Sequence, residues 1–92
     1  MKLEWDDRKR AKTIADRGLD FALVGAADWD TAFTREDTRK AYAEARFVTM
    51  APIDGRLCVV AWCWRGDALR VISLRKANER ERSRYEEALR QS

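Results

Sequence analysis

One uninterrupted apolar run constrains the fold more than any other feature: Leu57-Cys58-Val59-Val60-Ala61-Trp62-Cys63-Trp64. The run has the length of a β-strand, far below the roughly 20 residues that cross a bilayer. An antiparallel strand with one wet face alternates apolar and polar residues, and this run does not. We therefore expect both faces of its sheet to be covered, one by helices of this chain, with a second chain as a candidate cover for the other.

Glycine-containing turns stand on both sides of this run. Asp54-Gly55 is a strong signal for a two-residue hairpin loop, and Gly66-Asp67 is a weaker one because Arg65 can belong to the loop. The two turns predict a meander of three antiparallel strands: Arg46–Ile53, Arg56–Trp64 and Ala68–Leu74.

The N-terminal part carries helix-capping signals. Asp6 or Asp7 can cap a first helix, Gly18 suits its left-handed C-terminal cap, and Asp20 can cap a second helix. The predicted elements are an edge strand Leu3–Trp5, a helix from about Arg8 to Arg17 and a short helix Phe21–Ala27.

Beyond these elements, the polar segment Asp28–Lys40 predicts a mobile loop. Asn78 with Glu81 three residues later forms a variant capping box, which starts a last helix ending near Arg90. A strand, two helices, a three-stranded meander and a helix make an α+β fold, and the length of 92 residues gives one domain over residues 1–92.

Composition excludes several kinds of chemistry. Two cysteines and no histidine exclude a disulfide framework, a histidine-activated nucleophile and a zinc site, so we expect no metal and no cofactor. The charged N-terminal segment is not a signal peptide, and we expect a cytoplasmic protein without a membrane anchor. A net charge of +3 permits a polyanionic partner without requiring one.

Basic residues are concentrated between Arg65 and Arg84, and most are arginine, whose planar guanidinium binds two phosphate oxygens at once. Arg80 is our RNA-binding candidate there. A solvated helix face, with Glu and Arg paired to each other, is the alternative. The basic residues are Arg65, Arg70, Arg75, Lys76, Arg80, Arg82 and Arg84.

Two-residue loops would fix the strand register. Arg46 and Arg70 would then flank Cys63 on one face. Like charges repel across a sheet, so a bound anion is one reason for this arrangement. The alternative is that Glu4 or Glu44 lies between the two arginines.

The same register places Trp62 and Trp64 on the other face, which mixes aromatic and polar residues. Exposed Trp with Arg is typical of a protein-interface hot spot and also suits base stacking, with ordinary core packing as the alternative. Residues sharing that face are Phe47, Thr49, Val71, Ser73 and Arg75. We expect the helix-covered core on the opposite face, with Val48, Met50, Leu57, Val59, Ala61, Ile72 and Leu74.

Arg, Lys, Tyr and carboxylate side chains are enough to cleave RNA, because the 2′-hydroxyl supplies the nucleophile. Cations stabilise the charge that develops on the phosphoryl oxygens, and a Lys, Tyr or Glu transfers protons. Arg75 and Lys76 precede the predicted helix, where free N–H groups favour phosphate. In the predicted register, Arg75 lies on the same face as Trp62 and Trp64. Lys76 lies on the same face as Arg46 and Arg70.

Short tracts along nearly the whole chain, roughly Leu3 to Glu87, resemble the BrnT family of toxins in order and spacing. The tracts are Leu3-Glu4-Trp5-Asp6, Arg17-Gly18-Leu19-Asp20-Phe21, Arg39-Lys40-Ala41-Tyr42-Ala43-Glu44-Ala45-Arg46-Phe47-Val48, Asp54-Gly55-Arg56, Arg65-Gly66-Asp67, Arg70-Val71-Ile72-Ser73-Leu74-Arg75-Lys76-Ala77 and Glu81-Arg82-Ser83-Arg84-Tyr85-Glu86.

This resemblance implies a RelE-like ribonuclease fold, inhibition of translation by RNA cleavage, and neutralisation by a BrnA-like antitoxin with a ribbon-helix-helix part. Operator DNA would then be bound only through the antitoxin. The candidate site residues it implies are Arg46, Arg75 and Lys76, with Arg70 added from the register. Tyr42, our second RNA-binding candidate, matches the tract before the first meander strand.

The chain departs from the family where BrnT sequences commonly have His, at Lys40 and Arg17, and where they have Glu, at Ala45. Lys40 is therefore a candidate for proton transfer, provided that burial makes it release its proton more readily than a free lysine. Two other functions compete with a ribonuclease: a catalytically weak binding module that pairs with a DNA-binding antitoxin, and an unrelated small α+β domain.

Overall fold

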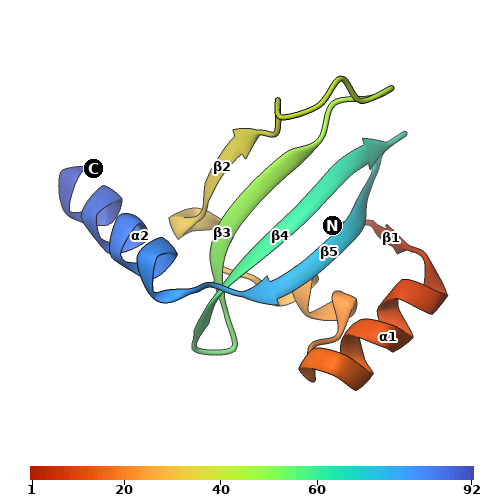
Figure 1. Ribbon diagram of the computed structural model, residues 1–92, viewed down its shortest axis with the longest axis horizontal. Coiled ribbons are helices and arrows are strands. Elements are labelled where there is room, and N and C mark those ends of the chain that lie inside the picture. The colour runs from red at the N-terminus through yellow and green to blue at the C-terminus, as the bar shows by residue number, and fades with distance from the viewer.

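The two predicted hairpins form the centre of a five-stranded mixed sheet. The computed structural model describes residues 1–92 and confirms an α+β fold (Figure 1). The strand order is β1-β5-β4-β3-β2, with β1 parallel to β5 and the other pairs antiparallel. The elements are β1 Leu3–Trp5, α1 Asp7–Arg17, 3₁₀ helices η1 Phe21–Ala26 and η2 Trp29–Thr31, β2 Phe33–Glu36, β3 Phe47–Ile53, β4 Arg56–Arg65, β5 Ala68–Lys76 and α2 Glu79–Gln91.

Local capping chemistry sets the helix ends as the sequence predicts. The Asp6 carboxylate accepts the first free N–H groups of α1, and Gly18 ends that helix in the left-handed region at φ 67°. Asp20 caps the second helix, which is 3₁₀ rather than α. Asn78 and Glu81 form the complete capping box of α2.

The segment Asp28–Lys40 was predicted to be a mobile loop, but it contains η2 and the additional strand β2. The prediction was therefore wrong for most of this segment. β2 is an edge strand that pairs only with β3, which is why its outward residues are polar. Two contacts hold it: the Thr34 and Thr49 hydroxyls lie 2.8 Å apart, and the Phe33 ring meets the Tyr85 ring of α2 edge-on, at 5.5 Å between centroids.

The hydrophobic core lies on the sheet face that carries Trp62, opposite to the face that we predicted. η1 packs there, behind the sheet in Figure 1, while no helix crosses the front of β3, β4 and β5. The polar Thr49 made this face look mixed in sequence, but the Trp62 indole N–H donates to its hydroxyl at 2.8 Å, so both groups are satisfied inside the core. Sheet residues of this covered face are Phe47, Ile53, Cys58, Val60, Trp62, Leu69, Val71 and Leu74.

A β-bulge in β5 changes which side chains share a face. Trp62 pairs with Val71, but its neighbour Ala61 pairs with Ser73, so Ile72 is an extra residue. Beyond it the alternation is inverted: Leu74 enters the core, and Arg75 moves to the opposite side. We call that side the open face, and its strand residues include Val48, Met50, Val59, Ala61, Cys63, Arg70, Ser73 and Arg75.

The two α-helices flank the sheet rather than bury it (Figure 1). α1 lies beside β1 and β5, where Arg10 forms a bidentate ion pair with Asp20 at 2.8 Å and Arg17 donates to the Leu74 carbonyl. α2 buries only Tyr85, whose hydroxyl donates to the Thr31 carbonyl at 2.7 Å. Neither helix is long and apolar enough to cross a membrane.

Candidate functional site

Arg46, Cys63 and Arg70 line one hollow on the open face, as the predicted register requires. The hollow measures about 180 Å³, below the roughly 300–1,000 Å³ of small-molecule pockets, which favours a group the size of a phosphate over a metabolite. We call it the cationic hollow; its lining is Lys9, Tyr42, Ala43, Glu44, Arg46, Cys63, Arg65, Arg70 and Ile72.

Two carboxylates neutralise part of this hollow. Glu4, on the neighbouring strand β1, binds Arg70 at 2.6 Å, and Glu44 binds Arg65 at 3.0 Å. The alternative that a glutamate lies beside the arginine pair therefore holds for Arg70. The charge balance still favours an anion, because four cations outnumber these two carboxylates.

Arg46 is the cation in the hollow that is most available to a ligand. No carboxylate lies within 4.0 Å of its guanidinium, which stacks on the Tyr42 ring, 4.3 Å from the ring centre. This contact orients the planar group without neutralising it. Lys9, from the first turn of α1, is also free of an ion pair. Its place in the hollow could not be predicted from the sequence, because nothing local shows that β1 pairs with β5.

A buried carboxylate, Asp37, holds the segment that carries Tyr42 and Arg46. It accepts hydrogen bonds from the backbone and guanidinium of Arg39 and from the Tyr42 hydroxyl, and its own N–H donates to the Arg46 carbonyl at 2.8 Å. The Arg39 guanidinium keeps the pKa of Asp37 well below its usual range. Sequence reasoning missed this residue, although an Asp two residues before Arg39 is a signal for an Asx-turn.

Cys63 lies in the cationic hollow but does not act as a nucleophile in this state. Its side chain is buried, and burial, with the charge of Glu44, raises the pKa of the thiol. The Sγ–H points to the Glu44 carboxylate at 3.6 Å. Since the thiolate is the reactive form, Cys63 remains a neutral part of the wall.

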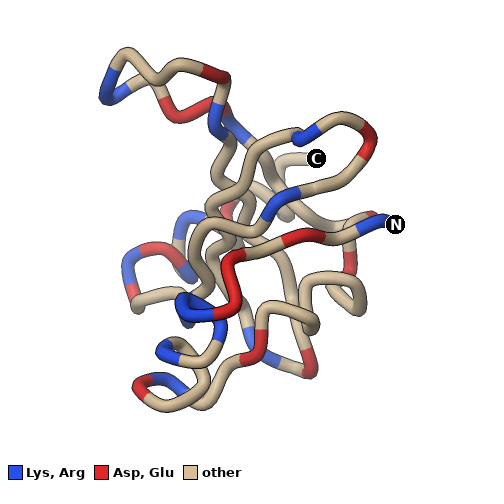
Figure 2. The backbone as a smooth tube through the Cα atoms, turned by 90° about the vertical axis from the view of Figure 1, so that its right-hand side faces the viewer, with Lys and Arg blue, Asp and Glu red and all other residues tan.

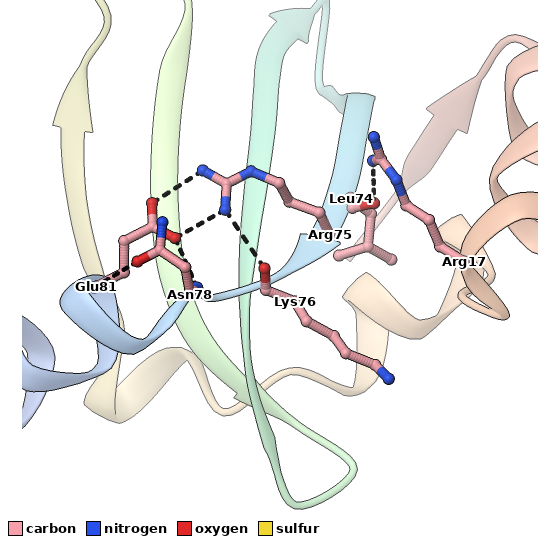
Figure 3. A network of polar contacts seen from close by, with 6 residues as sticks. All are labelled: Arg17, Leu74, Arg75, Lys76, Asn78 and Glu81. Atoms are coloured by element: carbon pink, nitrogen blue, oxygen red, sulfur yellow. Dashed lines mark hydrogen bonds and ion pairs between the residues drawn. The ribbon is translucent and has the colours of Figure 1, made fainter.

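Arg75 lies on the open face but is held by α2 (Figure 3). Its guanidinium binds the Glu81 carboxylate twice, at 2.7 and 2.9 Å, and Glu81 also accepts the Asn78 N–H. The predicted phosphate site between the strand end and the helix start is therefore occupied by Glu81. This pairing lowers the pKa of Glu81 from 4.5 to about 2, chiefly through the Arg75 hydrogen bonds.

Three other candidates lie outside the cationic hollow. Lys76 pairs in register with Cys58, a residue of the covered face, so the expectation that it shares a face with Arg46 and Arg70 was wrong because of the bulge. Arg80 is exposed at the start of α2, and Lys40 is exposed in the segment after β2, without the burial that proton transfer would require.

The two tryptophans of β4 have different environments. Trp62 is only 7% exposed and stacks on Phe47 at 4.8 Å between centroids, so it is a core residue and not a surface anchor. Trp64 is 53% exposed and meets Trp62 edge-on at 5.2 Å. The alternative of core packing thus holds for Trp62, while Trp64 remains accessible to a partner.

Figure 2, viewed from the side of β1, shows that Lys and Arg positions are interspersed with Asp and Glu positions along the backbone. No group of three or more Cys, Asp or Glu side chains is arranged to hold a metal ion. Four cations, Lys9, Arg46, Arg65 and Arg70, are nevertheless brought together in the cationic hollow.

The Arg75–Glu81 pair predicts a pH dependence of folding. A carboxyl whose pKa is lower in the folded state stabilises the fold above its unfolded value of 4.5, and this contribution disappears as the pH falls toward 2. Urea unfolding of Glu81→Gln should therefore show a smaller loss of unfolding free energy between pH 4.5 and 2 than the native chain. Glu79→Gln, on the same helix turn but without an ion pair, is the control and should keep the native slope.

The chain matches the model of a known protein family, whereas a search of curated proteins found no match. Residues 5–81 match the family described as "Ribonuclease toxin, BrnT, of type II toxin-antitoxin system". The match begins at the last residue of β1, includes strands β2 to β5 and the cationic hollow, and ends in the first turn of α2. The chain therefore belongs to the BrnT family of ribonuclease toxins of type II toxin–antitoxin systems.

Proposed function

We propose that this chain is a metal-independent endoribonuclease whose cleavage site is the cationic hollow on the open face. The observation that carries the proposal is Arg46, an oriented guanidinium without a carboxylate partner, in the same hollow as Arg70. Membership of a family of ribonuclease toxins supports the reaction class. The antiparallel strands β2 to β5, with helical segments on one face of the sheet, support a RelE-like architecture.

The reaction needs an in-line attack and charge stabilisation. The RNA 2′-oxygen attacks the neighbouring phosphorus, its proton passes to a base, and the 5′-oxygen leaves with a proton, giving a 2′,3′-cyclic phosphate and a 5′-hydroxyl. Arg46 and Arg70 would bind the phosphoryl oxygens as negative charge builds up. Glu44 is the carboxylate of the hollow suited to accept the first proton, and Lys9 is an ammonium suited to supply the second.

The proposal predicts cleavage of single-stranded RNA by the purified chain in EDTA. Products should end in a 2′,3′-cyclic phosphate and a 5′-hydroxyl, and a single 2′-deoxy substitution should abolish cutting at that position, because the nucleophile is removed. End-group analysis of a labelled oligonucleotide measures both. Cleavage that disappears in EDTA and returns with Mg²⁺ would contradict metal independence.

As a partner we propose a BrnA-like antitoxin with a ribbon-helix-helix DNA-binding part. The chain itself would bind operator DNA only through this antitoxin. A type II system implies a protein antitoxin. We place one contact with the antitoxin at Trp64, near the C-terminal end of β4. An exposed indole that packs against a buried aromatic neighbour is typical of an interface anchor.

A catalytically weak binding module is the second candidate. It is favoured by the absence of histidine and by the neutralisation of Arg70 and Arg75 by Glu4 and Glu81. Expression of the chain with and without an antitoxin encoded beside it separates the two. Growth arrest and RNA cleavage that the antitoxin suppresses support the enzyme; complex formation without either supports the module.

A further inference from the structure

We infer that a second hollow on the open face binds a nucleobase of single-stranded RNA, next to the phosphate held in the cationic hollow. This inference rests on the proposed function and adds a substrate subsite to it. The second hollow measures about 150 Å³ and lies between β2, β3, β4 and α2. We call it the base hollow; its lining is Phe33, Thr34, Arg35, Val48, Met50, Val59, Glu81 and Arg84.

The floor of the base hollow is apolar and its aromatic wall is fixed. Val48, Met50 and Val59 come from adjacent strands of the open face, where a flat ring can bury one side. Phe33 stands at the edge strand and is held edge-on by Tyr85. Unpaired bases are commonly bound by stacking on aromatic rings, independently of their sequence.

The rim of the base hollow is basic. Arg35 of β2 and Arg84 of α2 are exposed, and neither has a carboxylate within 4.0 Å. The one acid in the lining, Glu81, is already neutralised by Arg75. Two free guanidiniums around an apolar floor complement a base with its phosphate better than an apolar segment of a protein, whose insertion would leave these charges without a partner.

The two hollows are neighbours along the same strands. Val48 of β3 lies in the base hollow and Arg46, which directly precedes β3, lies in the cationic hollow; two residues of extended chain span about 7 Å. On β4, Cys63 of the cationic hollow and Val59 of the base hollow are four residues apart, which is about 13 Å along the strand. These distances are on the scale of neighbouring nucleotides in an extended chain, so one RNA strand can fill both sites.

Binding of a non-cleavable oligonucleotide tests the inference. The probe is a short RNA with one 2′-deoxy residue at the cut position, compared with versions that carry one abasic residue at each position in turn. Stacking of a base contributes enough that the native chain should lose about 5- to 150-fold in affinity for one abasic position beside the cut. Equal affinity for all abasic versions would overturn the inference.

Variants assign the effect to the base hollow. Phe33→Leu keeps apolar volume but removes the stacking ring, so its sensitivity to the abasic position should fall. The double variant Arg35→Ala with Arg84→Ala should bind the intact probe more weakly. The control double variant Arg56→Ala with Arg82→Ala also removes one exposed, unpaired guanidinium from a strand and one from α2, and it should bind the probe as the native chain does.

Two outcomes separate this inference from the proposed function. A chain that cleaves no RNA but binds the probe with the same abasic sensitivity retains the base subsite and loses the nuclease proposal. Variants of the base hollow that bind the probe normally but lose the antitoxin would assign the hollow to the protein partner and overturn the inference. Circular dichroism of each variant confirms that the sheet is intact.

Discussion

Arg46→Ala is expected to lower the rate of RNA cleavage about 100-fold while leaving the fold intact, because one cationic contact to the transition state is worth about this much. The guanidinium stacks on Tyr42 and forms no ion pair, so its loss leaves no carboxylate without a partner. Single-turnover cleavage of a labelled RNA at saturating enzyme measures the chemical step apart from binding.

Arg70→Ala should reduce cleavage at least as strongly, for a different reason. Removal of Arg70 leaves Glu4 unpaired beside the cationic hollow, where its charge repels the phosphate. The double variant Glu4→Gln with Arg70→Ala should therefore recover part of the lost activity. Arg56→Ala, at the far end of β4, removes the same charge without touching the hollow and should cleave at the native rate.

Alanine variants of the other two predicted cations, Arg75 and Lys76, should differ from these in their effects on stability and cleavage. Arg75→Ala breaks the contact to Glu81 and should affect stability more than cleavage, while Lys76→Ala should affect neither strongly, since Lys76 is exposed and pairs in register with the covered face. Full cleavage activity in both the Arg46 and Arg70 variants would remove the cationic hollow as the site of the reaction.

Features set by neighbouring residues were predictable from the sequence. The two hairpins depend on Asp54-Gly55 and Gly66-Asp67, and the start of α2 depends on Asn78 with Glu81; all three have the predicted form. Between β4 and β5 the observed register matches the predicted one from the turn as far as Trp62. Cys63 and Arg70 therefore lie opposite each other, as predicted. Each of these outcomes depends on backbone preferences over a few residues.

Features set by long-range contacts were not predictable in this way. The bulge at Ile72 has no local marker such as glycine, and it exchanged the faces of Arg75 and Lys76. The core face was misassigned because the hydroxyl of Thr49 reads as polar in sequence, whereas in the fold it accepts the Trp62 N–H. Asp37 shows the same limitation: its carboxylate reads as a loop charge until Arg39 and Tyr42 close around it.

Trp62→Ala tests the corrected core, and we expect it to lower the free energy of unfolding by about 3–5 kcal/mol, the usual cost of truncating a large buried aromatic side chain. Trp62 stacks on Phe47, meets Trp29 edge-on at 6.3 Å, and donates to Thr49. Small domains are stable by only about 5–15 kcal/mol, so the variant should lose a large part of its unfolding free energy. Urea unfolding followed by circular dichroism measures the difference.

Trp64→Ala is the matched control, because it removes the same side chain two residues away on the same face, where half of it is exposed. Its unfolding free energy should change by about 1 kcal/mol or less, while affinity for the antitoxin should fall by about 2 kcal/mol if Trp64 anchors the complex. Equal stability losses in the two variants would place both indoles in the core. A stable Trp62→Ala chain would contradict the assignment of the covered face, since a buried indole with three packing partners and a hydrogen bond cannot be removed without cost.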